Sequence, residues 1–167
     1  DPNLFQYTKD GPWSYEQQYL GYNYRMTDIQ AALGINQLNR LEKIIRKRNK
    51  VLEIYKDLMS ELPINFLEIP KKVKSSIHLV IIKLNNKDPN FHKIIFEKML
   101  ENNIGVQLHY SPIHLQPYFR KLGFNKGDFP EAENYSHNAF SIPVFTKLRL
   151  SQQKRVFFTL KKILKNS

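Results

Sequence analysis

The chain contains no cysteine, which excludes disulfide bonds, thiolate nucleophiles and thiolate metal ligands. A cysteine-free chain needs no oxidising compartment, so a cytoplasmic location is expected. No apolar run approaches the roughly 20 residues that a membrane-spanning helix needs, and residues 1–3 have neither the basic nor the apolar character of a leader. These absences predict a soluble protein with no membrane partner.

Glycine is also scarce, with six residues in the chain, and no GxxxxGK[ST] loop is present to cradle a phosphate. A GxSxG motif is missing too, so nucleophilic hydrolase chemistry has no support. His109 and His114 lie five residues apart across a proline, but the other three histidines do not supply further ligands at zinc spacing. No metal site is expected.

What is present is a chain of 167 residues, 41% hydrophobic and with a net charge of +11. This length suffices for one domain with its own core. The charge favours an acidic partner, but by itself it does not choose between nucleic acid, a membrane surface and a phosphate-bearing small molecule. Lysine and arginine concentrate in residues 40–50 and 147–165, at helical spacing, which is typical of solvated helix faces. Because aromatic residues do not interleave with the 40–50 run, a nucleic-acid partner is not expected.

The N-terminal residues predict an arm that precedes a long helical segment. Asp1 is not methionine and no helix or strand pattern follows it, so we expect the chain to be a piece of a longer polypeptide. Residues 1–25 mix turn formers with five tyrosines, a tryptophan and a phenylalanine, which favours an ordered arm covered by another domain or subunit. Thr27 and Gln30 form a capping box, and helical spacing continues to Pro63 as one long helix or two joined by a bend.

The rest of the chain alternates strand and helix patterns. We expect a strand at 77–84, a helix from the Asp88 cap to about Asn102, a strand at 106–110, a short helix after Pro130, an extended piece at 140–144 and a last helix capped by Ser151. The inward side chains are expected to be Phe91, Ile94, Ile95 and Met99 in the first of these helices, Val106, Leu108 and Tyr110 in the second strand, and Val156, Leu160 and Ile163 in the last helix. The order α-β-α-β-α-β-α predicts a small α/β layer with a few strands and helices on one side.

Two places gather side chains suited to binding. Asn23 and Arg25 precede the Thr27 cap, where free N–H groups and the helix dipole favour an anion; the alternative is a local turn and a surface ion pair. Residues 109–114 (HYSPIH) end a strand and enter a proline turn, where His109, Tyr110 and later Tyr118 suit a polar ligand and a stacked ring. The alternative there is that these are ordinary core and loop residues.

Four motifs occur in an order that resembles the DegT/StrS family of pyridoxal-phosphate-dependent nucleotide-sugar aminotransferases. They are GYNYRMTDIQAALG at 21–34, GVQLHYSPIH at 105–114, FPEAE at 129–133 and SIPV at 141–144. The stretch WSYEQ at 13–17 and the first motif look most similar to the transaminases of pseudaminic acid biosynthesis, which make a UDP-linked 4-amino-4,6-dideoxy sugar.

The resemblance implies the small C-terminal domain of a fold-type I enzyme. Residues 1–25 would form an arm that carries a cross-subunit loop, and 26–167 the small α/β domain. The large domain, with the lysine that binds pyridoxal 5'-phosphate, would lie outside this chain. No lysine here is therefore expected to be catalytic, and the chain alone is expected to be inactive.

The resemblance also implies residue roles in a homodimeric enzyme of polysaccharide biosynthesis. Asn23 would reach the cofactor phosphate of the other subunit, and Arg25 would touch the substrate diphosphate or the carboxylate of the amino donor. The entrance for the sugar nucleotide would be formed by His109, Tyr110, His114 and Tyr118. Glutamate would supply the amino group, and the acceptor would be the C4 ketone of a UDP- or other nucleotide-linked sugar.

Two alternatives remain open within the family. A relative that has lost catalysis would act as a regulator or sensor. The other alternative is a sugar 3-dehydratase of the same family, in which histidine replaces the catalytic lysine.

Overall fold

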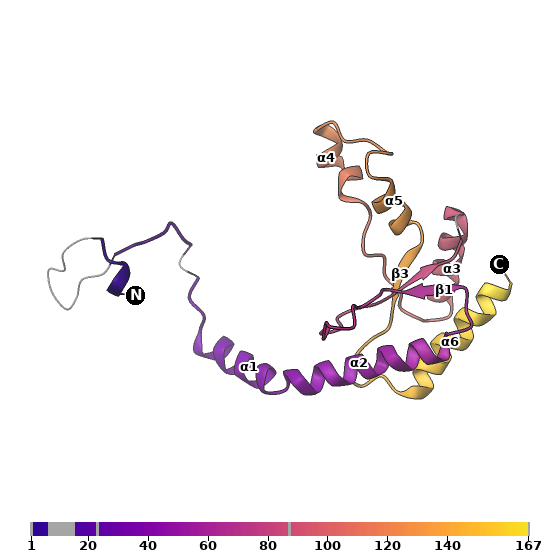
Figure 1. Ribbon diagram of the computed structural model, residues 1–167, viewed down its shortest axis with the longest axis horizontal. Helices are drawn as coiled ribbons and strands as arrows, with labels where there is room; N and C mark the ends of the chain where they lie inside the picture. The colour runs from indigo at the N-terminus through magenta and orange to yellow at the C-terminus, as the bar shows by residue number, and fades with distance from the viewer. Residues whose placement is uncertain (1, 7–15, 23, 87, 167) are drawn as a thin grey trace. The chain divides into compact units, whose positions relative to one another are not determined.

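The computed structural model describes residues 2–6, 16–22, 24–86 and 88–166 (Figure 1). The chain divides into two compact units, Asp1–Asn39 and Arg40–Ser167. The expected separation of an arm, 1–25, from a domain that begins at residue 26 stays a prediction.

In the first unit, the 3-10 helix η1 (Pro2–Leu4) precedes helix α1 (Asp28–Asn39). The capping box at the start of α1 is confirmed. The Thr27 N–H donates to Gln30 Oε1 at 2.9 Å, and the Gln30 N–H donates to Thr27 Oγ1 at 3.3 Å. These reciprocal bonds satisfy two N–H groups that the first turn of a helix leaves without partners.

In the second unit, three antiparallel strands form a sheet in the order β1-β2-β3. They are β1 (Ile64–Phe66), β2 (Val80–Leu84) and β3 (Ala139–Ile142). Strand β1 pairs Ile64 with Leu84, and β3 pairs Ile142 with Val80. Strand β1 was not predicted, because three residues after a proline carry too short a pattern to reveal a strand without its partner.

Three helices of the second unit contribute to one hydrophobic core with the sheet. They are α2 (Leu41–Leu58), α3 (Pro89–Glu101) and α6 (Leu150–Lys165). The core gathers Val80, Ile82 and Leu84 of β2 with Tyr55, Ile95, Met99 and Leu160 of the helices, while Lys83 of β2 is exposed. The expected α/β architecture is thus confirmed, and the helical segment before Pro63 consists of two helices separated in the chain by Arg40.

The helix starts and faces were predicted with mixed success. The Asp88 carboxylate accepts a hydrogen bond from the Asn90 N–H at 2.9 Å, which confirms that cap. Helix α6 begins earlier than expected: its cap is Arg149, whose N–H donates to Gln152 Oε1 at 2.9 Å, so Ser151 lies inside the first turn. Ile94 was expected in the core but is 41% exposed, because the neighbouring Ile95 takes the buried position.

Between α3 and β3 the chain leaves the core and returns (Figure 1). This connection carries the 3-10 helix η2 (Ile113–Leu115), α4 (Pro117–Lys121) and α5 (Pro130–Ser136). The strand expected at 106–110 is not formed: only Gln107 pairs, in a single bridge with Ser141. Pro112, which has no N–H for a ladder, follows closely, and the chain turns away from the sheet edge. Among the described residues, no helix has the length and apolar composition that crossing a bilayer requires.

Candidate functional site

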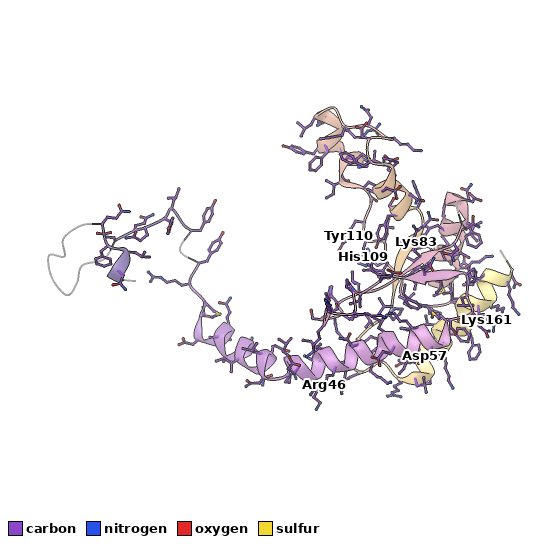
Figure 2. All side chains as sticks on the ribbon, in the orientation of Figure 1. Arg46, Asp57, Lys83, His109, Tyr110 and Lys161 are labelled. Atoms are coloured by element: carbon purple, nitrogen blue, oxygen red, sulfur yellow. The ribbon has the colours of Figure 1, made fainter. Side chains whose placement is uncertain are left out.

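His109 and Tyr110 lie at the free edge of β3 (Figure 2). Two backbone hydrogen bonds join Gln107 to Ser141, at 3.3 and 2.8 Å, and bring the next residues against the strand. Nε2 of His109 is 2.8 Å from Oγ of Ser141. The rings of His109 and Tyr110 meet edge to face, with centroids 4.8 Å apart, and the peptide bond between the two residues is cis.

The orientation of Tyr110 corrects the expectation from strand alternation. Val106 is buried as expected, but Tyr110 is 70% exposed although it was expected on the same face. The reason is that alternation requires a continuous strand, and the pairing ends at Gln107. An exposed aromatic ring beside a half-buried histidine is suited to stacking on a flat ligand group.

Lys83 lies on the same face of the sheet as Ser141. In the register of β2 and β3, Ser141 pairs with Ile81 and Ala139 pairs with Lys83, and residues paired in this way share a face. The Lys83 side chain is exposed and has no ion pair within the described part of the chain. Lys83 was not among the predicted site residues. The feature that could have indicated it is that Lys83 is the one charged residue in the apolar segment 77–84.

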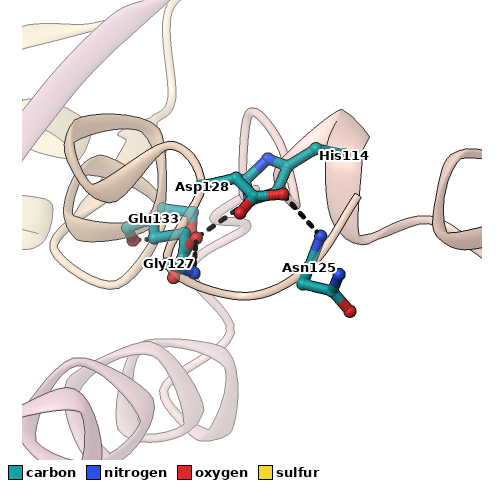
Figure 3. Close-up of polar contacts among 6 residues, drawn as sticks. His114, Asn125, Gly127, Asp128 and Glu133 are labelled. Atoms are coloured by element: carbon teal, nitrogen blue, oxygen red, sulfur yellow. Dashed lines mark hydrogen bonds and ion pairs between the residues drawn. The ribbon is translucent and has the colours of Figure 1, made fainter. Parts of the chain in front are cut away.

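His114 is buried beneath the loop, where it contacts α5 (Figure 3). Its Nε2 is 2.9 Å from Oε1 of Glu133, and the same oxygen accepts a 2.7 Å hydrogen bond from the N–H of Gly127. The Gly127 N–H and, next, the His114 side chain lower the pKa of Glu133 below its ordinary value. This cluster therefore joins η2, the loop at Gly127 and α5.

An open apolar hollow of about 400 Å³ lies over this cluster. It is lined by Ile113, His114, Phe119, Phe124, Phe129 and Ala132. Tyr118 is 68% exposed, and its ring lies edge to face against Phe119 at 5.3 Å. The three phenylalanines were not predicted as site residues, since their spacing in the sequence shows no common face.

The remaining predicted residues belong to the first unit. Arg25 is exposed and precedes the capped start of α1. Asn23 lies outside the described residues. The other four predicted residues, His109, Tyr110, His114 and Tyr118, all lie in the connection between α3 and β3. The rings of His109 and Tyr110 contact each other, whereas His114 contacts Glu133 and Tyr118 contacts Phe119.

The described donor groups do not fit a complete pyridoxal-phosphate pocket. None of the described lysines is buried, whereas a lysine that forms an imine must be able to lose its charge, which burial promotes. The hollow beside His114 is lined by aromatic and aliphatic groups, which do not bind a phosphate. Nor do three His, Asp or Glu side chains of the described ranges gather as a metal site would require. The described residues are thus better suited to contact a substrate than to hold a cofactor or metal.

Residues 6–161 match the DegT/DnrJ/EryC1/StrS aminotransferase family. The chain belongs to this family. The match covers the sheet edge, the loop, α2, α3 and most of α6. The family uses pyridoxal phosphate: a solved relative is known in its pyridoxal and pyridoxamine phosphate forms.

Individual relatives agree with this membership. The UDP-4-amino-4,6-dideoxy-N-acetyl-beta-L-altrosamine transaminase of Campylobacter jejuni is 35% identical over 91% of this chain and 40% of its own length. The sugar aminotransferase Spr1654 of Streptococcus pneumoniae superposes with a TM-score of 0.84 at 28% identity, over 95% of this chain and 40% of its own. Helicobacter pylori PseC, an aminotransferase of pseudaminic acid biosynthesis, gives a TM-score of 0.82 at 28% identity over 96% and 43%. The chain therefore spans about 40% of the length of these family members.

Proposed function

We propose that this chain forms the substrate-side domain of a homodimeric aminotransferase that moves an amino group from glutamate to the C4 ketone of a nucleotide-linked 4-keto-6-deoxy sugar. The observation that carries the proposal is the family match over residues 6–161 together with the His109–Tyr110 pair at the edge of β3. The name of the Campylobacter relative supports a UDP-linked sugar.

The residues of this chain would bind and orient the sugar nucleotide. Tyr110 presents an exposed ring for stacking on a base or sugar, and His109 presents a ring fixed against Ser141. Lys83 supplies a positive charge on the same face for the diphosphate. Tyr118 would line the entrance, and His114 would contribute by holding the loop through Glu133.

Arg25 and Asn23, which precede α1, have proposed roles of their own. Arg25 would contact the substrate diphosphate or the donor carboxylate. Asn23 would contact the phosphate of pyridoxal phosphate in the other subunit. The imine-forming lysine would come from outside this chain, and a cytoplasmic location remains part of the proposal.

A second candidate is a non-catalytic relative. A pleiotropic regulatory protein of Geobacillus stearothermophilus is 33% identical over 85% of this chain, so a protein named for regulation is similar to most of it. Such a protein would use the same edge to bind a sugar nucleotide without transferring an amino group.

The test is transfer of isotopically labelled nitrogen from glutamate. The polypeptide produced from the gene is purified and incubated with pyridoxal phosphate, labelled glutamate and a UDP-linked 4-keto-6-deoxy sugar, and the products are analysed by mass spectrometry. Label in the sugar nucleotide is the expected result. Binding of the sugar nucleotide without label transfer would favour the regulator, and loss of the 3-hydroxyl would identify a dehydratase.

A further inference from the structure

Ser141 is a buried polar residue in the strand that carries the site. It is 6% exposed in β3, where all four residues are buried. Its neighbours Phe140 and Ile142 point into the hydrophobic core, so Ser141 faces the opposite side of the sheet. A buried hydroxyl requires hydrogen-bond partners.

The partners of Ser141 determine which group donates. The Oγ of Ser141 donates to the carbonyl oxygen of Gln107 at 3.4 Å, because a carbonyl can only accept. With its one proton directed there, the hydroxyl offers a lone pair to His109 Nε2 at 2.8 Å. In this arrangement a neutral His109 carries its proton on Nε2, which leaves a lone pair on Nδ1.

The other ring nitrogen of His109 is enclosed and has no hydrogen-bond partner among the described residues. An acceptor without a donor is a costly arrangement in a folded protein, and it often marks a place where a ligand completes the bonding. The ring of Tyr110, which contacts His109, is largely exposed, so it has room to move and admit a ligand.

We propose that Ser141 is a positioning residue that fixes the Nε2–H tautomer of His109, so that Nδ1 accepts a hydrogen bond from a hydroxyl or amide N–H of the sugar nucleotide. Two bonds give Ser141 this role: the one to His109 and the one to Gln107, whose backbone is itself paired with Ser141. The claim that a sugar nucleotide donates to Nδ1 rests on the proposed function. The claim that Ser141 fixes the tautomer of His109 does not.

The first experiment measures the tautomer of His109 in the full chain by long-range nitrogen–proton NMR correlations of the histidine rings. The Nε2–H form is expected in the unmodified chain and in Ser141→Thr, which keeps a hydroxyl. Ser141→Ala is expected to release the ring into a mixture of tautomers. Ser136→Ala is the matched control, because Ser136 is an equally buried serine whose hydroxyl donates to the carbonyl of Glu133 in α5. An unchanged tautomer in a folded Ser141→Ala chain would overturn the proposal.

The second experiment separates positioning from general stability. In the polypeptide that carries aminotransferase activity, Ser141→Ala is expected to raise KM for the sugar nucleotide roughly tenfold, as loss of one well-placed hydrogen bond does. The glutamate half-reaction should keep its rate, and Ser141→Thr should restore KM. Equal slowing of both half-reactions would overturn the positioning role. If no amino transfer is found at all, the proposed function fails, and the NMR experiment still decides the tautomer.

Discussion

The imidazole of His114 and the carboxylate of Glu133 are both buried, and His114 Nε2 lies 2.9 Å from Glu133 Oε1. The pair joins η2 to α5 across a loop, and the Gly127 N–H donates to the same carboxylate. The loop that carries His109 and Tyr110 is therefore held at two places: at β3 through His109, and at α5 through His114.

Glu133→Ala should loosen this loop. The substitution removes the acceptor shared by His114 and the Gly127 N–H, and a buried donor without an acceptor is destabilising. We expect the melting temperature to fall by a few degrees and the amide exchange of residues 113–129 to accelerate. Glu131→Ala is the control, since Glu131 lies in the same first turn but is exposed. Equal effects of both variants would show that the pair does not hold the loop.

Acid should weaken the same attachment. The Gly127 N–H and the His114 side chain hold the pKa of folded Glu133 below its ordinary value of 4.5. Below that value the unfolded chain takes up the proton first, so the contribution of Glu133 is complete above about pH 4.5 and is lost as the pH falls through the folded pKa. Unfolding curves measured at successive pH values should show this loss. Glu133→Gln, which does not titrate, should show a smaller dependence on pH in this range.

His92 should make stability depend on pH at a higher range. Burial of the ring lowers the pKa of His92 below its ordinary value of 6.5, and the charge of His137 lowers the pKa further. The hydrogen bond from Nε2–H to the Ala139 carbonyl raises the pKa but does not outweigh burial. Between the folded pKa and 6.5 the unfolded chain binds more protons, so stability must fall as the pH falls through this window. Denaturant midpoints at neutral and mildly acid pH measure the effect. His92→Gln should reduce the dependence, and an identical slope in the variant would contradict the prediction.

Tyr55→Phe should destabilise the second unit by about 1 kcal/mol. The Tyr55 hydroxyl donates to the carbonyl oxygen of Pro143 at 3.1 Å and connects α2 to the segment after β3. Burial raises the pKa of Tyr55, so the hydroxyl stays protonated and keeps donating at neutral pH. Chemical denaturation measures the change. Tyr118→Phe, at an exposed tyrosine, should leave stability unaltered within error.

Lys83→Ala should weaken binding of the sugar nucleotide without unfolding the protein. Lys83 is exposed on β2, so dissolved salt would partly screen the attraction between its charge and the diphosphate. We expect KM to rise several-fold, and the rise to shrink at high salt. Lys154→Ala, which removes an exposed charge on α6, is the control. An effect independent of salt, or equal to that of the control, would exclude a direct role in phosphate binding.

The parts of the fold that depend on neighbouring residues were predictable from the sequence. The Thr27–Gln30 box and the Asp88 cap form within a single turn, so their residue types suffice to place them. The core positions of α6 follow from spacing in one helix, and Val156, Leu160 and Ile163 are buried as expected. The family itself was predicted from four short motifs in order, and the match over residues 6–161 confirms it.

The candidate site was predicted only in part, because its geometry depends on contacts between distant segments. Tyr110 was expected inside and is exposed, since the strand that would have oriented it ends at Gln107. His114 looked like a loop residue open to a ligand, but its burial follows from Glu133, 19 residues further along. Nothing near Ser141 in the sequence indicates a hydrogen bond to His109, 32 residues before it.

By itself, the sequence determined the caps, the helical periods, the apolar strand at the centre of the sheet and the family. Each of these depends on residues that are close together in the chain or on motifs that recur in the family. Only the tertiary structure decided that β1 pairs with β2, that His114 is enclosed with Glu133, and that Ser141 orients His109. Each of these depends on burial of a polar group or a strand edge, and burial is a property of the packed chain rather than of any one segment.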